Sequence, residues 1–254
     1  MRGEYCIAGA SVFSFISVVL MVFAIIGQVN PTSLPKSIYM VKLDVAAYGA
    51  GLQNAMKSAP NGLYMTNGSA PLGKNTGLRQ EYRWGVLNSC GYAKEGGVCN
   101  STRFPVEFQP LETILSDTPM KFFIQTNDII PDEADKFRSE SFNGNLSKVG
   151  SVLMVVGGAA ALLALIFGVI PNRLTFAVST VMSIIATLTL LIGAAIWTAI
   201  IKQDEFINKV QVEGKKPLGI IVSSGPALYL TWVAFAFSLL SVAPYLISCC
   251  TYRK

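Results

Sequence analysis

Four long apolar runs divide the chain, and a long polar segment separates the first run from the second. The runs cover residues 6–27, 149–170, 174–201 and 227–250. As α-helices, at about 1.5 Å per residue, all four can cross a ~30 Å hydrocarbon core. A cleaved signal peptide is the alternative for the first run, but its apolar core is usually about 7–15 residues long, so a retained helix is favoured. The pattern predicts an all-α membrane bundle with four transmembrane helices.

Residues 28–148 are polar and rich in proline, and they contain no run long enough to span a membrane. The segment therefore predicts one folded domain outside the bilayer. Residues 132–142 have the charge density of an exposed helix, with a break expected at Asn143-Gly144-Asn145. Short stretches rich in β-branched or aromatic residues predict a small antiparallel sheet from residues 38–45, 82–87, 104–108 and 122–126.

Three N-glycosylation acceptor sequences begin at Asn67, Asn100 and Asn145, all inside residues 28–148. They place this segment outside the cell or in the lumen, as a large first outer loop with a small extracellular β domain. The positive-inside rule gives mixed support, because the second outer loop is rich in lysine. The remaining segments are then a cytoplasmic N-terminus (1–5), a cytoplasmic turn (171–173), a second extracellular loop (202–226) and a cytoplasmic C-terminus (251–254).

Cys90 and Cys99 are the only two of the five cysteines that lie well away from the apolar runs. Their spacing suits a small disulfide-closed loop within the outer sheet. Trp84 shortly precedes them. Two interpretations of the segment from Trp84 to Cys99 remain open: a brace that holds the outer sheet, or a surface presented to a partner.

Composition narrows the possible functions. The chain is 52% hydrophobic and 14% charged, which is typical of a membrane protein. The formal charge of +5 is dispersed without a basic run, so no nucleic-acid partner is expected. Histidine is absent and the four apolar runs contain no charged residue, which disfavours a metal centre, a pump and a coupled transporter. We expect no cofactor, no metal, no catalytic residue and no enzymatic activity.

Small residues and end-of-helix cysteines mark further candidate positions. Gly157, Gly158 and Gly193 lie within apolar runs, where small side chains let neighbouring helices approach closely. Cys249 and Cys250 lie near the end of the fourth run beside a basic tail, a setting in which S-acylation is possible. The alternative is that both cysteines serve as small apolar residues. Three aromatic residues near helix ends are expected at the membrane interface: Trp197, Tyr229 and Trp232.

The sequence Trp84-Gly85-Val86-Leu87, followed by Cys90 and Cys99, resembles the claudin-like superfamily pattern of Trp, Gly-Leu-Trp, Cys and Cys. The final aromatic residue is absent here, and Trp84 directly precedes Gly85 instead of lying upstream. The whole chain is more similar to the fungal SUR/PalI family of eisosome and pH-response tetraspan proteins. Its fourth run, with Trp232 and two cysteines before a basic tail, also resembles theirs.

The resemblance implies a claudin-like four-helix tetraspan of the plasma membrane with both termini in the cytoplasm. It implies a non-enzymatic role in organising membrane domains or as an accessory subunit of a membrane complex, linked to cell-wall integrity. An alternative is a PalI-like subunit of an ambient-pH sensing receptor complex, and a channel or membrane enzyme is less favoured. Expected partners are membrane lipids and another integral membrane protein or a second copy, met through the helices or the outer loop.

Overall fold

The computed structural model describes the chain almost from end to end. The described residues are 2–31, 33–100, 104–131, 135–170, 172–212 and 216–251.

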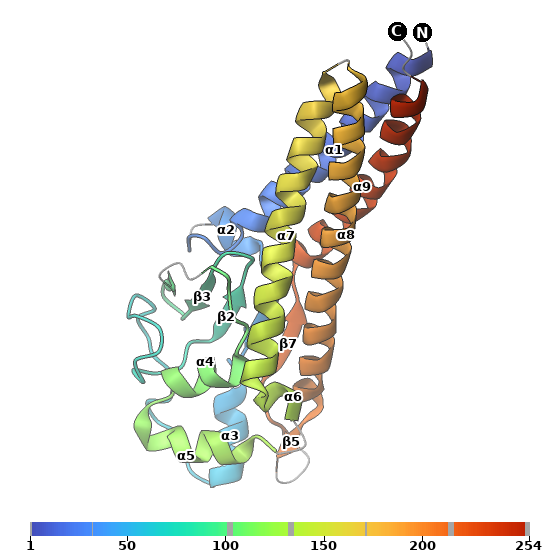
Figure 1. Ribbon diagram of the computed structural model, residues 1–254. Coiled ribbons are helices and arrows are strands. Elements are labelled where there is room, and N and C mark those ends of the chain that lie inside the picture. The colour runs from blue at the N-terminus through green and yellow to red at the C-terminus, as the bar shows by residue number, and fades with distance from the viewer. Residues whose placement is uncertain are drawn as a thin grey trace.

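Four long helices form an elongated bundle. Among the described residues, these are the helices long and apolar enough to cross a membrane. Helix α7 packs along α8, α1 packs along α9, and α8 packs along α9. Both chain ends lie at one end of the bundle (Figure 1). The predicted four-helix architecture is confirmed, with helices α1 (Arg2–Ile26), α7 (Glu140–Val169), α8 (Arg173–Asp204) and α9 (Pro226–Thr251).

Helices α7 and α8 are longer than the apolar runs that predicted them. The 32 residues of α8 correspond to about 48 Å at 1.5 Å per residue, well beyond a ~30 Å hydrocarbon core. Helix α7 begins at Glu140 and passes through Asn143-Gly144-Asn145, so the expected break there is wrong. Asn143 is buried and its Nδ2 lies 3.1 Å from Asp204 Oδ2 of α8. This tertiary contact compensates for the low helix propensity of the sequence.

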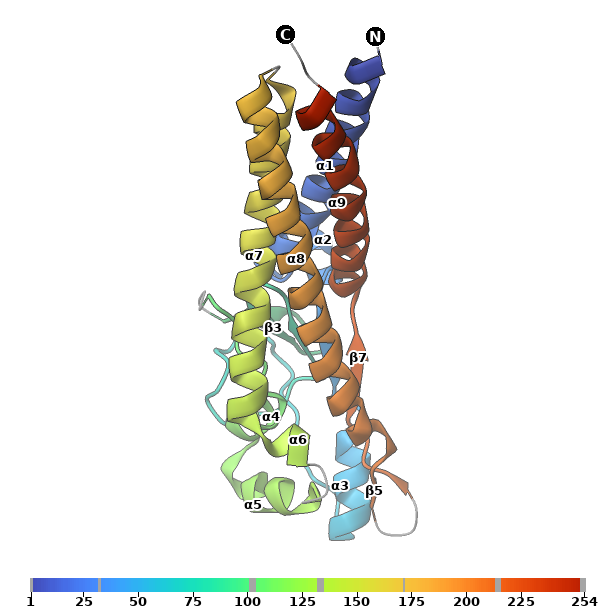
Figure 2. The same ribbon diagram turned by 45° about the vertical axis from the view of Figure 1, so that its right-hand side comes forward.

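The ends of α7 and α8 that lie away from the chain termini flank a folded polar domain (Figure 2). We call it the head domain; it comprises the described residues from 27 to 139 and from 205 to 225. Its antiparallel sheet has the strand order β4-β3-β2-β1-β7. The expected strands at residues 38–45 and 82–87 correspond to β1 and β2. The five strands are β1 (Val41–Asp44), β2 (Glu81–Trp84), β3 (Ser89–Tyr92), β4 (Gly97–Cys99) and β7 (Ile221–Ser224).

Strand β7 comes from the connection between α8 and α9, which was expected to be a separate loop. It pairs with β1 in the register Val41↔Ser224 to Asp44↔Ile221. Leu218, Ile220 and Val222 are buried, which explains why this segment folds onto the head domain. The same connection also contains the short helix η2 (Glu205–Lys209) and the strands β5 (Gln211–Val212) and β6 (Lys216–Pro217).

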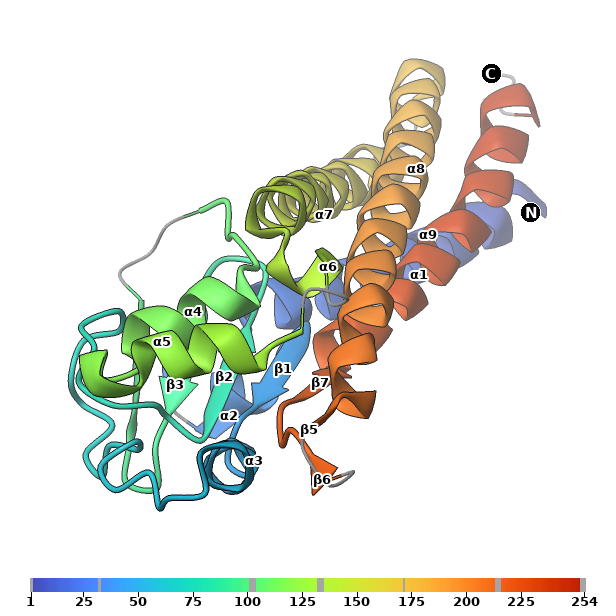
Figure 3. The same cartoon turned by 90° about the horizontal axis from the view of Figure 1, so that it is seen from below.

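Two predicted strands are wrong. Residues 104–108 contain no strand, and residues 122–126 belong to helix α5 (Met120–Ile129). Phe122 and Thr126 are four positions apart and both are buried, as on the inner face of a helix. Of the helix expected at 132–142, residues 132–134 lie outside the described part. The other short helices, seen around the sheet in Figure 3, are α2 (Ser33–Ser37), α3 (Tyr48–Met56), α4 (Pro110–Asp117) and α6 (Asp135–Arg138).

The three glycines singled out in the apolar runs have different surroundings. A Cβ atom on Gly157 would lie 2.8 Å from the Leu190 side chain of α8. One on Gly193 would lie 3.1 Å from the Gly150 carbonyl oxygen of α7. Gly158 faces α1 instead, and its nearest neighbour would be Ile25 at 3.4 Å. Close approach of α7 and α8 therefore depends on Gly157 and Gly193, whereas Gly158 has room for a methyl group.

We predict that Gly157→Ala lowers the thermal stability of the detergent-solubilised protein, because the new methyl group would force α7 away from α8. Gly158→Ala is the matched control, since the same methyl group fits there and Ala favours a helix over Gly by about 1 kcal/mol. Thermal unfolding followed by size-exclusion chromatography measures both. Equal stability of the two variants would contradict the assigned packing.

Candidate functional site

Trp84 connects the head domain to the long helices through a column of aromatic rings. It ends strand β2 and is only 2% exposed. Its ring meets Phe108 edge-on, with ring centroids 4.9 Å apart and an interplanar angle of 88°. The Phe108 ring in turn lies 6.2 Å from Trp197 of α8. The segment that contains Trp84 is therefore fixed to the bundle by buried aromatic packing.

Trp197 was expected at the membrane interface, and this expectation is wrong. Its side chain is fully buried between α7 and the head domain, and a Cβ atom on Gly150 would lie 2.9 Å from its ring. Trp232 is half-buried, and its indole Nε1 donates a hydrogen bond to Thr198 Oγ1 at 3.1 Å. Tyr229 is 61% exposed. The position of Trp197 near the end of an apolar run did not reveal that α8 continues into the head domain.

Gly85 of the Trp-Gly-Val-Leu motif permits a close approach between the head domain and the end of α1. A Cβ atom at this position would lie 2.4 Å from the Gly27 carbonyl oxygen, closer than any side chain tolerates. Val86 is buried and Leu87 is half-buried behind it. The motif is thus explained by packing against the end of α1.

Gln28, directly after α1, forms a second connection that the sequence pattern did not reveal. The residue is fully buried, and its side-chain Nε2 lies 2.8, 2.8 and 3.0 Å from the carbonyl oxygens of Pro35, Lys36 and Ile38. Its Oε1 accepts a hydrogen bond from the Tyr92 hydroxyl at 2.9 Å. Burial raises the pKa of Tyr92 to about 12, so the phenol keeps the donated proton at neutral pH. Gln28 therefore joins α1, the following turn and strand β3.

The disulfide between Cys90 and Cys99 is confirmed. The two cysteines face each other in the pairing of β3 with β4. Cys90 is 1% exposed, and its sulfur lies 3.1 Å from the Gln28 carbonyl oxygen. The bond therefore fixes the edge of the sheet beside the joint with α1.

Arg79 and Asp117 form a buried ion pair in the head domain, which sequence reasoning also missed. Both side chains have at most 1% exposure. The second Asp117 oxygen accepts from the Gly73 backbone N–H at 2.6 Å, and the Tyr82 hydroxyl donates to the carboxylate at 2.8 Å. Burial, together with the charge of Asp117, raises the pKa of Tyr82 well above its usual value. The cluster ties α4 and the turn-rich segment before β2 to the sheet.

The three acceptor asparagines are all exposed. Asn67 and Asn100 lie in the head domain, and Asn145 lies on the α7 end that flanks it. Ser147, the third residue of the last acceptor sequence, is buried and its Oγ accepts from the Phe108 N–H at 2.8 Å. Ser101 and Thr102 of the Asn100 sequence lie outside the described residues. Glycosylation at the three positions stays a prediction.

Hydroxyl groups dominate the polar contacts inside the bundle. Ser183 Oγ lies 2.7 Å from Ser241 Oγ, and Thr187 Oγ1 lies 3.1 Å from Ser238 Oγ, both between α8 and α9. Ser17 of α1 donates to a backbone carbonyl of α9 at 2.9 Å. Such contacts hold membrane helices together. The side chains of Cys249 and Cys250 lie outside the described part, so their acylation stays a prediction.

We predict that Arg79→Met destabilises the protein by about 3–5 kcal/mol, because it leaves the Asp117 carboxylate buried without its cation. Lys42→Met is the control: it breaks a half-exposed pair with Asp44, 3.4 Å apart, and should cost about 0–1 kcal/mol. Chemical denaturation in detergent compares the two. A similar loss for both variants would show that the Arg79 pair is not the stabilising contact.

Replacing Cys90 and Cys99 with Ser should reduce stability by roughly 2–3 kcal/mol in the chain-entropy model and lower delivery of the protein to the cell surface. The burial of Cys90 against Gln28 is the reason to expect a brace. Surface biotinylation and thermal unfolding measure the effect. Normal stability and delivery, combined with loss of a crosslinked partner, would instead assign this segment to an interface.

Comparison with known proteins agrees with this architecture. The SUR7/PalI family model matches residues 6–250, from the first turns of α1 to the end of α9. No curated protein matches the chain. Since the match covers nearly all of the sequence and all four membrane-spanning helices, this chain belongs to the SUR7/PalI family.

Proposed function

We propose that the protein is a non-enzymatic tetraspan of the plasma membrane that organises membrane domains or serves as an accessory subunit of a membrane complex, linked to cell-wall integrity. The observation that carries this proposal is the attachment of the head domain to the bundle at three separate places. Gln28 follows α1, Trp197 lies on α8, and β7 connects α8 to α9 while pairing with β1. A partner bound to the head domain would therefore set the lateral position of the helices as well.

The bundle supports this role through its surface and its interior. Large apolar side chains are exposed along all four helices, for example Phe15, Leu163, Leu188 and Leu240. These surfaces suit contact with lipid tails and with other membrane helices. Inside the bundle, pairs of hydroxyl groups join the helices. The buried carboxylate of Asp204 lies at the end of α8 that is next to the head domain, where Asn143 donates to it. This arrangement favours a structural role over ion or proton transport.

For the orientation, we propose that the head domain is extracellular and that both termini are cytoplasmic. The support is the exposure of Asn67, Asn100 and Asn145 on or beside the head domain, together with the position of the chain ends at the opposite end (Figure 1). Partners would then be met mainly through the head domain or the helices. Membership of the SUR7/PalI family also supports a second candidate function, a PalI-like subunit of an ambient-pH sensing receptor complex.

Crosslinking in intact membranes, followed by identification of neighbours, tests the proposal. We expect a discrete crosslinked species that contains a second copy or another integral membrane protein, and a patchy distribution of the tagged protein. Freely diffusing protein without neighbours would contradict the proposal. A multi-span receptor as the neighbour, with loss of the alkaline response on deletion of the protein, would favour the second candidate.

A further inference from the structure

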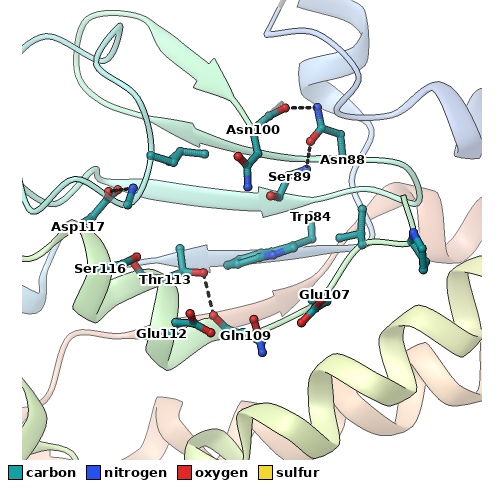
Figure 4. A pocket seen from close by; sticks show the side chains of 14 residues that line it. Trp84, Asn88, Ser89, Asn100, Glu107, Gln109, Glu112, Thr113, Ser116 and Asp117 are labelled. Atoms are coloured by element: carbon teal, nitrogen blue, oxygen red, sulfur yellow. Dashed lines mark hydrogen bonds between the residues drawn. The ribbon is translucent and has the colours of Figure 1, made fainter. Parts of the chain in front are cut away.

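The head domain contains a pocket of about 560 Å³ between the sheet and helix α4 (Figure 4). Its volume is in the range of small-molecule sites, ~300–1,000 Å³. Strands β2 and β3 with the turn between them form one wall. The extended segment before α4 and the exposed face of α4 form the other. Its lining includes Trp84, Ser89, Asn100, Glu107, Gln109 and Glu112.

The pocket wall offers polar groups that have no partner among the described residues. Within the described part of the chain, the Glu112 carboxylate, the Gln109 side-chain amide and the Ser89 hydroxyl make no hydrogen bond or ion pair. Glu112 lies in the first turn of α4, Gln109 directly precedes this helix, and Ser89 begins strand β3. They supply acceptors and donors together, since an amide and a hydroxyl do both. A ligand with several hydroxyl groups could satisfy them at once.

The charge of the pocket excludes several other ligand classes. Glu107 is paired with Lys148 at 2.8 Å, and Asp117 is paired with Arg79. Among the described residues that line the pocket, Glu112 is therefore the carboxylate without a paired cation, and none of these residues is a lysine or an arginine. A single free carboxylate is too few for a hard divalent cation, which prefers several oxygen ligands. The described lining residues themselves offer no positive charge to an anion.

The floor of the pocket adds an apolar element. The Trp84 indole lies along it, packs against Phe108 and is only 2% exposed. Leu72, Pro105 and Val106 are further apolar lining residues. The C–H groups of a pyranose ring can pack against such an apolar surface, and the hydroxyl groups around the ring can bind the polar side chains. The combination of a few polar groups with an apolar floor is typical of a small-molecule site.

We propose that this pocket binds a neutral sugar, with Glu112, Gln109 and Ser89 contacting its hydroxyl groups. The exposed Asn100, a predicted glycan acceptor, lines the rim, and its carbonyl oxygen accepts from Asn88 Nδ2 at 2.9 Å. The same sugar chemistry can therefore come from the glycan of this chain or from another molecule. Sugar binding at this pocket does not depend on the proposed role of the protein in membrane organisation.

The test uses the full-length protein in detergent, both with its N-glycans and after their complete enzymatic removal. Saturation-transfer NMR and titration calorimetry measure binding of mannobiose, laminaribiose and chitobiose, with trilysine as a cationic probe. We expect Glu112→Ala to weaken binding about ten-fold or more, the effect of losing a hydrogen bond to a charged group, and Gln109→Ala to weaken it as well. Glu95→Ala is the matched control, since it removes an exposed carboxylate at the far end of the β3–β4 hairpin.

Binding of a disaccharide with and without the N-glycans supports a sugar supplied by another molecule. Binding only after their removal supports the Asn100 glycan as the occupant, and Asn100→Gln should then reproduce the effect. The proposal is overturned if no disaccharide binds in either form of the folded protein. It is also overturned if binding persists unchanged in both Glu112→Ala and Gln109→Ala, or if trilysine binds and no sugar does.

Discussion

The arrangement of the molecule depends on how the head domain meets the long helices. A buried polar group must find a partner, and Gln28 does so with carbonyl oxygens of the following turn and with the Tyr92 hydroxyl. On the other side, the rings of Trp84, Phe108 and Trp197 form continuous buried contacts from the sheet to α8. The hydrogen bonds of Gln28 on one side and the aromatic packing on the other hold the head domain and the apolar helix bundle in a fixed orientation.

The sheet extends this constraint across distant parts of the chain. Its central strand β1 pairs with β2 on one side and with β7 on the other. Because β7 follows α8 in the chain, the sheet of the head domain can be completed only after α1, α7 and α8 have been made. The disulfide closes the opposite edge of the sheet, and the Arg79–Asp117 pair anchors α4 beneath it. Folding of the head domain and assembly of the bundle are therefore coupled.

The same framework shows that the Trp84 to Cys99 segment has the buried packing expected of a brace, although its tip at Lys94, Glu95 and Gly96 is exposed. Trp84, Gly85 and Cys90 are all buried against other parts of the molecule. Of the three unpartnered pocket groups among the described residues, Glu112 and Gln109 lie on α4 and directly before it, and Ser89 lies on β3 within this segment. This segment therefore forms one wall of the pocket and contributes Ser89 to it, while Glu112 and Gln109 come from the opposite wall.

The sequence alone determined the four membrane helices, the disulfide, strands β1 and β2, and the similarity to the family. These features depend on local composition: apolar length, cysteine context and β-branched residues. Only the tertiary structure decided the helical state of residues 122–126, the continuation of α7 through Asn143, and the addition of β7 to the sheet. It also decided the burial of Trp197, the role of Gln28 and the pairing of Arg79 with Asp117. Each of these depends on contacts between residues far apart in the chain, whose energies override local propensity and leave no periodic pattern in the sequence.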